Sequence, residues 1–293
     1  MNQMLLKEAL NQMKSDFEEA IKTATYINTK GKKVQKDNGQ KAKEALIRSS
    51  TFINKIHEVV KESLNKKLLE EGFSEFKIHP PIGKSSPELD VWGFLKKKKQ
   101  DIVVTFKPHK QSEKIKQGPL INQIDKLGKK VTEKSIVIGV RSQLSSIDNN
   151  FDTLMERAFA EAMNLHIRHP ELIMGEVYLL IVKEYDKHAM EKNEVKFVDK
   201  YTNVERFISL FNGISHRKCK AKKRRMTDSY KYESSSLLLV DFSQNPVKIY
   251  TKIEELKADG IVSEDFNEDF VSLSPIGFTN RLLNCYKERH GIE

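Results

Sequence analysis

Three short segments between residues 87 and 161 give the clearest indication of the fold: Pro87-Glu-Leu-Asp90, Ser135-Ile-Val-Ile-Gly-Val-Arg-Ser-Gln143 and Phe151-Asp-Thr-Leu-Met-Glu-Arg-Ala-Phe-Ala-Glu161. The first two open or contain apolar runs that predict strands, and the third has the apolar spacing of an amphipathic helix. A carboxylate begins one strand, polar side chains end the next, and the helix carries acids. We therefore expect a polar site where one sheet meets one helix.

The rest of the chain alternates between strand and helix patterns. Residues 174–185 are apolar in their middle and predict a central strand covered on both faces. Residues 89–95 and 101–107 predict a hairpin with a basic turn at 96–100. Other strands are predicted at 76–79, 237–242 and 247–250, and helices at 119–130, 203–214, 251–258 and 275–290. This mixture predicts an α/β fold with a mixed central β-sheet flanked by helices.

The N-terminal region differs from the rest. Residues 2–26 and about 41–71 have the spacing of amphipathic helices, joined by a basic loop at 29–41. We predict an N-terminal helical layer over residues 1–72 and an α/β core over residues 73–293. A basic insertion at 215–233 would interrupt this core.

Positive charge is clustered along the chain. The net charge is +10, and residues 216–225 alone hold seven Lys or Arg residues. Such clusters neutralise phosphates and favour nucleic acid, although solvated loops have the same composition. The residues expected to contact DNA are Lys97, Lys98, Ser142, Ser145, Arg217, Lys218, Lys220, Lys222, Lys223, Arg224 and Arg225.

The compartment is predicted from what the sequence contains. There are two cysteines, Cys219 and Cys285, without zinc-ligand spacing, and they do not suggest a disulfide framework. No apolar run approaches the ~20 residues that span a bilayer, and the first residues lack the pattern of a secretory signal. We expect a cytoplasmic protein without a membrane partner.

Pro87-Glu-Leu-Asp90, a strand, and then a second strand with a polar end resemble the PD-(D/E)XK nucleases, and within them the type II restriction endonucleases. The resemblance implies a restriction-endonuclease-like fold and Mg²⁺-dependent cutting of double-stranded DNA at a short sequence, usually by a homodimer. Two residues are inserted here between the signature Pro and Asp. The resemblance covers residues 75–185.

The resemblance also implies roles for individual residues. Asp90 would hold Mg²⁺, which prefers one or two carboxylates with water and substrate phosphate. The (D/E)XK triplet could be Thr105-Phe106-Lys107 or Arg141-Ser142-Gln143, and both lack the carboxylate.

We favour the second triplet, with the missing carboxylate moved onto the following helix. Glu156 suits the family's spacing, whereas Glu161 lies at the margin of the predicted packed face. Arg141 and Gln143 would then address water and the scissile phosphate. Lys107 would supply the amine if the first triplet applies.

A non-catalytic function is the alternative. A basic DNA- or RNA-binding protein would have the same charge clusters, and its carboxylates would only pair with its cations. Cutting that requires Mg²⁺ would distinguish the two.

Overall fold

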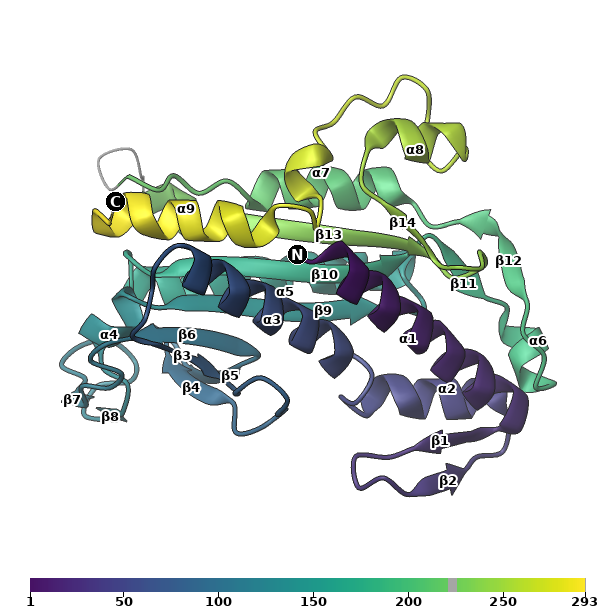
Figure 1. Ribbon diagram of the computed structural model, residues 1–293, viewed down its shortest axis with the longest axis horizontal. Helices are drawn as coiled ribbons and strands as arrows, with labels where there is room; N and C mark the ends of the chain where they lie inside the picture. The colour runs from purple at the N-terminus through teal and green to yellow at the C-terminus, as the bar shows by residue number, and fades with distance from the viewer. Residues whose placement is uncertain (221–225, 293) are drawn as a thin grey trace.

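The computed structural model describes residues 1–220 and 226–292 (Figure 1). Its centre is a six-stranded sheet in which β9, β10 and β13 are parallel, while β3, β6 and β14 run antiparallel to their neighbours. In spatial order the strands are β14 (Lys248–Tyr250), β13 (Ser234–Asp241), β10 (Ile173–Ile181), β9 (Ile136–Gln143), β6 (Ile102–Phe106) and β3 (Phe76–His79). The predicted mixed α/β fold is confirmed.

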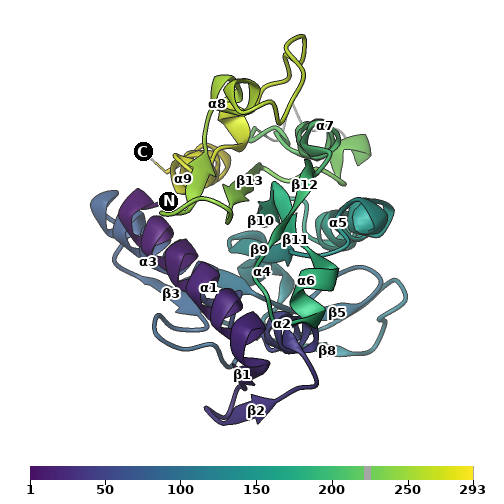
Figure 2. The same cartoon turned by 90° about the vertical axis from the view of Figure 1, so that its right-hand side faces the viewer.

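Helices cover both faces of this sheet (Figure 2). The helices on one face are α1 (Gln3–Thr23), α3 (Asn54–Glu70) and α9 (Phe278–His290), and those on the other are α5 (Phe151–Arg168) and α7 (Val204–Ile214). All nine residues of β10 are buried. Continuous apolar sequence is expected of a strand covered on both faces, so the central strand was predicted correctly.

The N-terminal helices are shorter than predicted. The helix expected over 41–71 is two helices, α2 (Gly39–Arg48) and α3, because the chain turns at 49–53. Ser49 Oγ donates to Leu46 O, and Ser49 N donates to Ala45 O and Leu46 O, which ends α2. The loop expected at 29–41 contains a hairpin of β1 (Thr25–Ile27) and β2 (Lys33–Gln35).

The predicted pairing of the middle strands is wrong. β4 (Leu89–Trp92) pairs with β5 (Lys97–Gln100) in a separate two-stranded sheet, and β6 pairs instead with β3 and β9. The lysines that we expected in a turn form β5, which lies outside the core, whereas the apolar residues of β6 enter the central sheet.

The prediction of a helix at 119–130 is also wrong. That region is a small sheet of β7 (Glu113–Lys114) and β8 (Ile124–Asp125), followed by α4 (Lys129–Glu133). The remaining helices and strands are β11 (Lys183–Tyr185), α6 (Lys187–Glu191), β12 (Phe197–Tyr201) and α8 (Ile253–Ala258).

Cys219 and Cys285 form a disulfide, with their Cα atoms 5.1 Å apart. The sequence did not suggest this bond. The bond joins the start of the basic insertion to α9, two segments that lie side by side only in the folded chain. In the described residues, no helix is both long and apolar enough to cross a membrane.

Candidate functional site

A carboxylate from β10 lies directly over the backbone of β9. Glu176 stands opposite Gly139 in the register of these parallel strands. A Cβ atom on Gly139 would come within 2.2 Å of Glu176 Oε2. Glycine is therefore required here by the close approach of the Glu176 side chain to the β9 backbone.

A second carboxylate approaches β9 from the other side. Asp101 immediately precedes β6, whose first residue, Ile102, pairs with Ile138. Its Oδ2 atom accepts a hydrogen bond from Val140 N at 2.8 Å. β6 and β10 are the two neighbours of β9, so the two acids approach the same part of the central strand.

Glu176 is held in an unusual electrostatic state. Its side chain is 1% exposed, and neither carboxylate oxygen has a hydrogen-bond partner among the described residues. Burial raises the pKa of Glu176 to about 6; the Arg141 guanidinium opposes this rise, and the charge of Asp101 adds to it. A buried carboxylate without hydrogen bonds is costly unless a cation compensates it.

Two cations lie close to these acids. Arg141 follows Gly139 by two residues and therefore lies on the same side of β9. Its Nη1 atom is 3.4 Å from Glu176 Oε1, and its Nη2 atom pairs with Glu161 of α5. Lys98 of β5 places Nζ 2.5 Å from the other oxygen of Glu161. Glu161 is thus paired with two cations.

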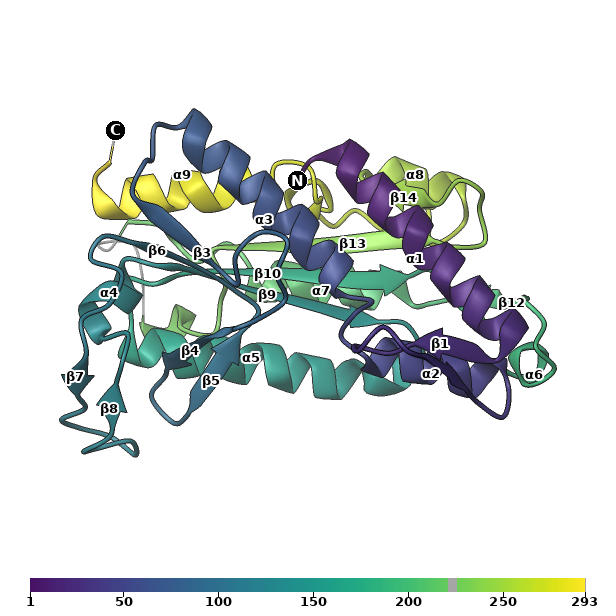
Figure 3. The same ribbon diagram turned by 60° about the horizontal axis from the view of Figure 1, so that its bottom comes forward.

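A cleft of about 530 Å³ opens beside these residues, between β5 and α5. The charged residues that line it are Lys96, Lys98, Arg141, Glu156, Arg157 and Glu161. Figure 3 shows the β4–β5 hairpin and α5 on the same side of the central sheet. This cleft is the approach by which a substrate could reach Arg141.

Asp90 does not lie with these acids. It is on β4, outside the central sheet, where its half-exposed carboxylate is 3.1 Å from Lys97 Nζ. Lys107 is at the opposite end of β6 from Asp101 and pairs with Glu75, and both are exposed. The structure therefore does not bring Asp90 or Lys107 close to Glu176, Asp101 and Arg141, although the sequence predicted both as catalytic residues.

Only some of the other predicted catalytic residues lie at this site. Arg141 and Glu161 do meet at the site, and Glu156 is exposed at the cleft. Gln143, at the end of β9, donates from Nε2 to the carbonyl oxygen of Ser145 at 2.6 Å. Ser142, which lies between Arg141 and Gln143 and was predicted to contact DNA, is half-buried. Of the two helix acids, Glu161 is therefore the one with contacts inside the site.

The expected DNA contacts in the basic insertion need one correction. Arg217 is 4% exposed, and its Nη1 atom is 2.9 Å from the buried carboxylate of Glu233, so it stabilises the core. Lys218 is exposed, and Lys220 lies 3.5 Å from Glu288. Lys222, Lys223, Arg224 and Arg225 lie outside the described residues.

The site predicted from the sequence contains neither Asp101 nor Glu176. Asp101 begins an apolar strand as Asp90 does, and Glu176 is the one acid within nine residues of an otherwise apolar strand. In residues 1–220 and 226–292, no group of three or more His, Cys, Asp or Glu is arranged to hold a metal ion. Mg²⁺ needs only one or two carboxylates. Asp101 and Glu176 fit this ion, because both buried oxygens of Glu176 lack a hydrogen-bond partner among the described residues.

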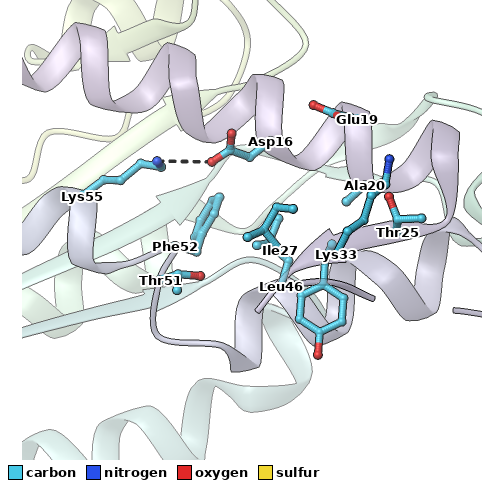
Figure 4. Close-up of a pocket in the computed structure, with 11 residues that line it drawn as sticks. Asp16, Glu19, Ala20, Thr25, Ile27, Lys33, Leu46, Thr51, Phe52 and Lys55 are labelled. Carbon is cyan, nitrogen blue, oxygen red and sulfur yellow. Dashed lines mark ion pairs between the residues drawn. The ribbon is translucent and has the colours of Figure 1, made fainter. Parts of the chain in front are cut away.

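A separate cavity of about 370 Å³ lies among α1, the β1–β2 hairpin and the α2–α3 turn (Figure 4). Asp16 and Lys55 form an ion pair of 3.3 Å at its edge, and Phe52 and Leu46 form part of its wall. It shares no lining residue with the cleft beside Arg141. We therefore assign the candidate chemistry to the cleft.

No family model, curated protein or solved structure matches this chain.

Proposed function

We propose that the protein is a Mg²⁺-dependent DNA endonuclease whose metal ligands are Asp101 and Glu176. The observation that carries this proposal is Glu176. Its carboxylate is buried, makes no hydrogen bond to any residue that the structure describes, and lies beside a second carboxylate and an arginine. Burying such a group costs stability, and a role in holding a cation would account for its presence.

The resemblance to the PD-(D/E)XK nucleases fits better if the triplet is moved two residues earlier on β9. The triplet becomes Gly139-Val140-Arg141, in which Arg141 takes the lysine position. Gly139 takes the acid position, and the Glu176 carboxylate fills the space where a side chain at 139 would begin. Asp101, at the start of the neighbouring strand, replaces Asp90 as the signature aspartate.

Each side chain then has a distinct task. Asp101 and Glu176 offer oxygen ligands, and bound Mg²⁺ would activate water and stabilise charge developing on the phosphate. Arg141 holds Glu176 and Glu161 in place and keeps a buried Nη1 atom without a hydrogen-bond partner in the described residues. Lys98 stands beside the cleft, where its ammonium can attract a phosphate.

The substrate follows from charge and from the resemblance. We propose double-stranded DNA, cut at a short sequence by a homodimer. The net charge of +10 supports a polyanionic substrate.

Incubation with plasmid DNA and Mg²⁺ tests this function. We expect discrete fragments from the wild-type protein, and no cutting by Glu176→Gln or Asp101→Asn, with DNA affinity retained by both variants. Asp90→Asn is the matched control, since its carboxylate pairs with Lys97 outside the central sheet, and it should still cut. Intact plasmid with the wild-type protein, or full cutting by Glu176→Gln, would refute the proposal.

One observation favours a binding protein without catalysis. Glu161 is paired with both Lys98 and Arg141, as expected of an ion-pair network that only stabilises the fold. In that case DNA or RNA would be retained without being cut, and the Glu176→Gln variant would behave as the wild-type protein does.

A further inference from the structure

The turn that carries Lys96 is fixed to α5 by a single side chain. Asn164 is 5% exposed, and its Oδ1 atom accepts from Leu95 N at 2.8 Å and from Lys96 N at 3.2 Å. Its Nδ2 atom donates to Lys96 O at 3.1 Å. The turn between β4 and β5 is therefore held against the helix by every polar atom of this amide.

Backbone packing supports the same attachment. Phe94 N donates to the carbonyl oxygen of Asn164 at 2.7 Å. A Cβ atom on Gly93 would lie 2.2 Å from Asn164 Nδ2, so the backbone at this glycine lies directly against the amide. Lys96 is thus presented from a defined backbone on one wall of the cleft.

Arg157 presents a second cation from the other wall. It lies on α5 and lines the same cleft as Lys96. Glu161, one turn further along the helix, is already paired with Lys98 and Arg141. Neither Lys96 nor Arg157 has an ion-pair partner within residues 1–220 and 226–292.

The cleft therefore has an excess of positive charge. Four cations line it, against the two acids Glu156 and Glu161, and only Glu161 is engaged in ion pairs in the described part of the chain. The Lys96 ammonium and the Arg157 guanidinium, which have no ion-pair partner in the part of the chain that the structure describes, match the oxygens of a phosphate group. A phosphate held there would lie next to Arg141, and so next to the proposed metal ligands.

We infer that Lys96 and Arg157 form a binding site for a backbone phosphate of nucleic acid, separate from the scissile phosphate. The inference rests on the proposed function for its substrate class, but it concerns binding and not cutting. The site would set the position of the strand relative to Asp101 and Glu176.

Binding of a short DNA duplex tests the site when it is measured by fluorescence anisotropy in EDTA over a range of salt concentrations. We expect the Lys96→Ala/Arg157→Ala variant to bind about tenfold more weakly and to show a slope of log K against log salt that is shallower by about one unit. Lys99→Ala is the matched control: it removes an exposed neighbouring charge of β5 that does not line the cleft.

Inorganic phosphate then distinguishes the source of the ligand. If inorganic phosphate displaces the duplex from the wild-type protein and not from the double variant, the site binds an isolated phosphate group. Weakened duplex binding without such competition would indicate recognition of the backbone.

Three results would overturn the inference: a wild-type protein that does not bind the duplex, unchanged affinity and salt slope in the double variant, or an equal loss in Lys99→Ala. The proposed function is tested separately, because Glu176→Gln should bind the duplex normally and fail to cut it. If the wild-type protein binds but never cuts, the phosphate site stands and the nuclease proposal fails.

Discussion

Glu176 is an ionisable residue in a strand whose nine residues are all buried. The free energy of unfolding should therefore depend on the protonation of this carboxylate, and so on pH. Burial raises its pKa to about 6, above the ordinary value of 4.5, so the folded protein holds this proton more tightly than the unfolded chain. The contribution of this group is therefore most favourable below pH 4.5 and is lost as the pH rises through 6.

Glu176→Gln should remove this cost. In EDTA at pH 7.5 we expect the variant to be more stable than the wild-type protein by about 2 kcal/mol, because a shift of one pKa unit corresponds to about 1.4 kcal/mol. Near pH 4 the two should have equal stability. Urea denaturation at both pH values measures this difference, and a variant that is less stable at pH 7.5 would contradict the account of Glu176.

Gly139 should not tolerate a methyl group. Its Cβ would come within 2.2 Å of Glu176 Oε2, so Gly139→Ala must displace the carboxylate or the strand. We expect a loss of about 1–3 kcal/mol in the free energy of unfolding, and loss of cutting. Gly213→Ala is the control: nothing lies within 4 Å of its added Cβ on α7, and a gain of up to about 1 kcal/mol is expected there. Equal stability of the two variants would refute the close approach.

At the scale of secondary-structure elements, Asn164 connects α5 to the turn of the β4–β5 hairpin. Asn164→Ala leaves the amide groups of Leu95 and Lys96 without their acceptor, so we expect a loss of about 2 kcal/mol in stability. DNA affinity should fall as well, because Lys96 would no longer be held at the cleft. Thr153→Ala, at an exposed position of the same helix, should change neither quantity.

The elements could largely be predicted from the sequence, and their pairing could not. The boundaries of α5, β9 and α7 follow from apolar periodicity, which is a local property. The local sequence does not show whether β6 pairs with β4 or with β9. That pairing depends on which strands are buried in the central sheet, and their burial depends on residues that are distant in the sequence. The sequence pointed to Asp90 because that residue follows a proline-containing loop near the start of an apolar strand. Asp101 also stands at the start of an apolar strand but has no such proline before it.

At the scale of the whole molecule, the base of the basic insertion is fixed to the core. Glu233 is buried between Arg217 and Arg289, at 2.9 and 2.7 Å, and the Cys219–Cys285 disulfide joins the same segment to α9. The sequence predicted that all the cations of the basic cluster lie on one surface. Arg217 belongs instead to the interior, because its buried partner Glu233 immediately precedes β13.

Reduction of the disulfide should lower stability without unfolding the protein. A disulfide typically contributes about 2–4 kcal/mol, and this one closes a loop between residues separated by 66 positions. Urea denaturation with and without dithiothreitol measures the loss, and Cys219→Ser/Cys285→Ser should match the reduced wild-type protein and be insensitive to the reductant. A reductant effect that persists in the double variant would show that the disulfide is not its source.

Binding of Mn²⁺, followed by electron paramagnetic resonance in the absence of DNA, tests the assignment of the metal ligands most directly. The wild-type protein and Asp90→Asn should bind the ion alike, while Asp101→Asn and Glu176→Gln should each weaken binding by at least about tenfold. Retained binding in Glu176→Gln together with its loss in Asp90→Asn would contradict the account and return the site to the outer hairpin.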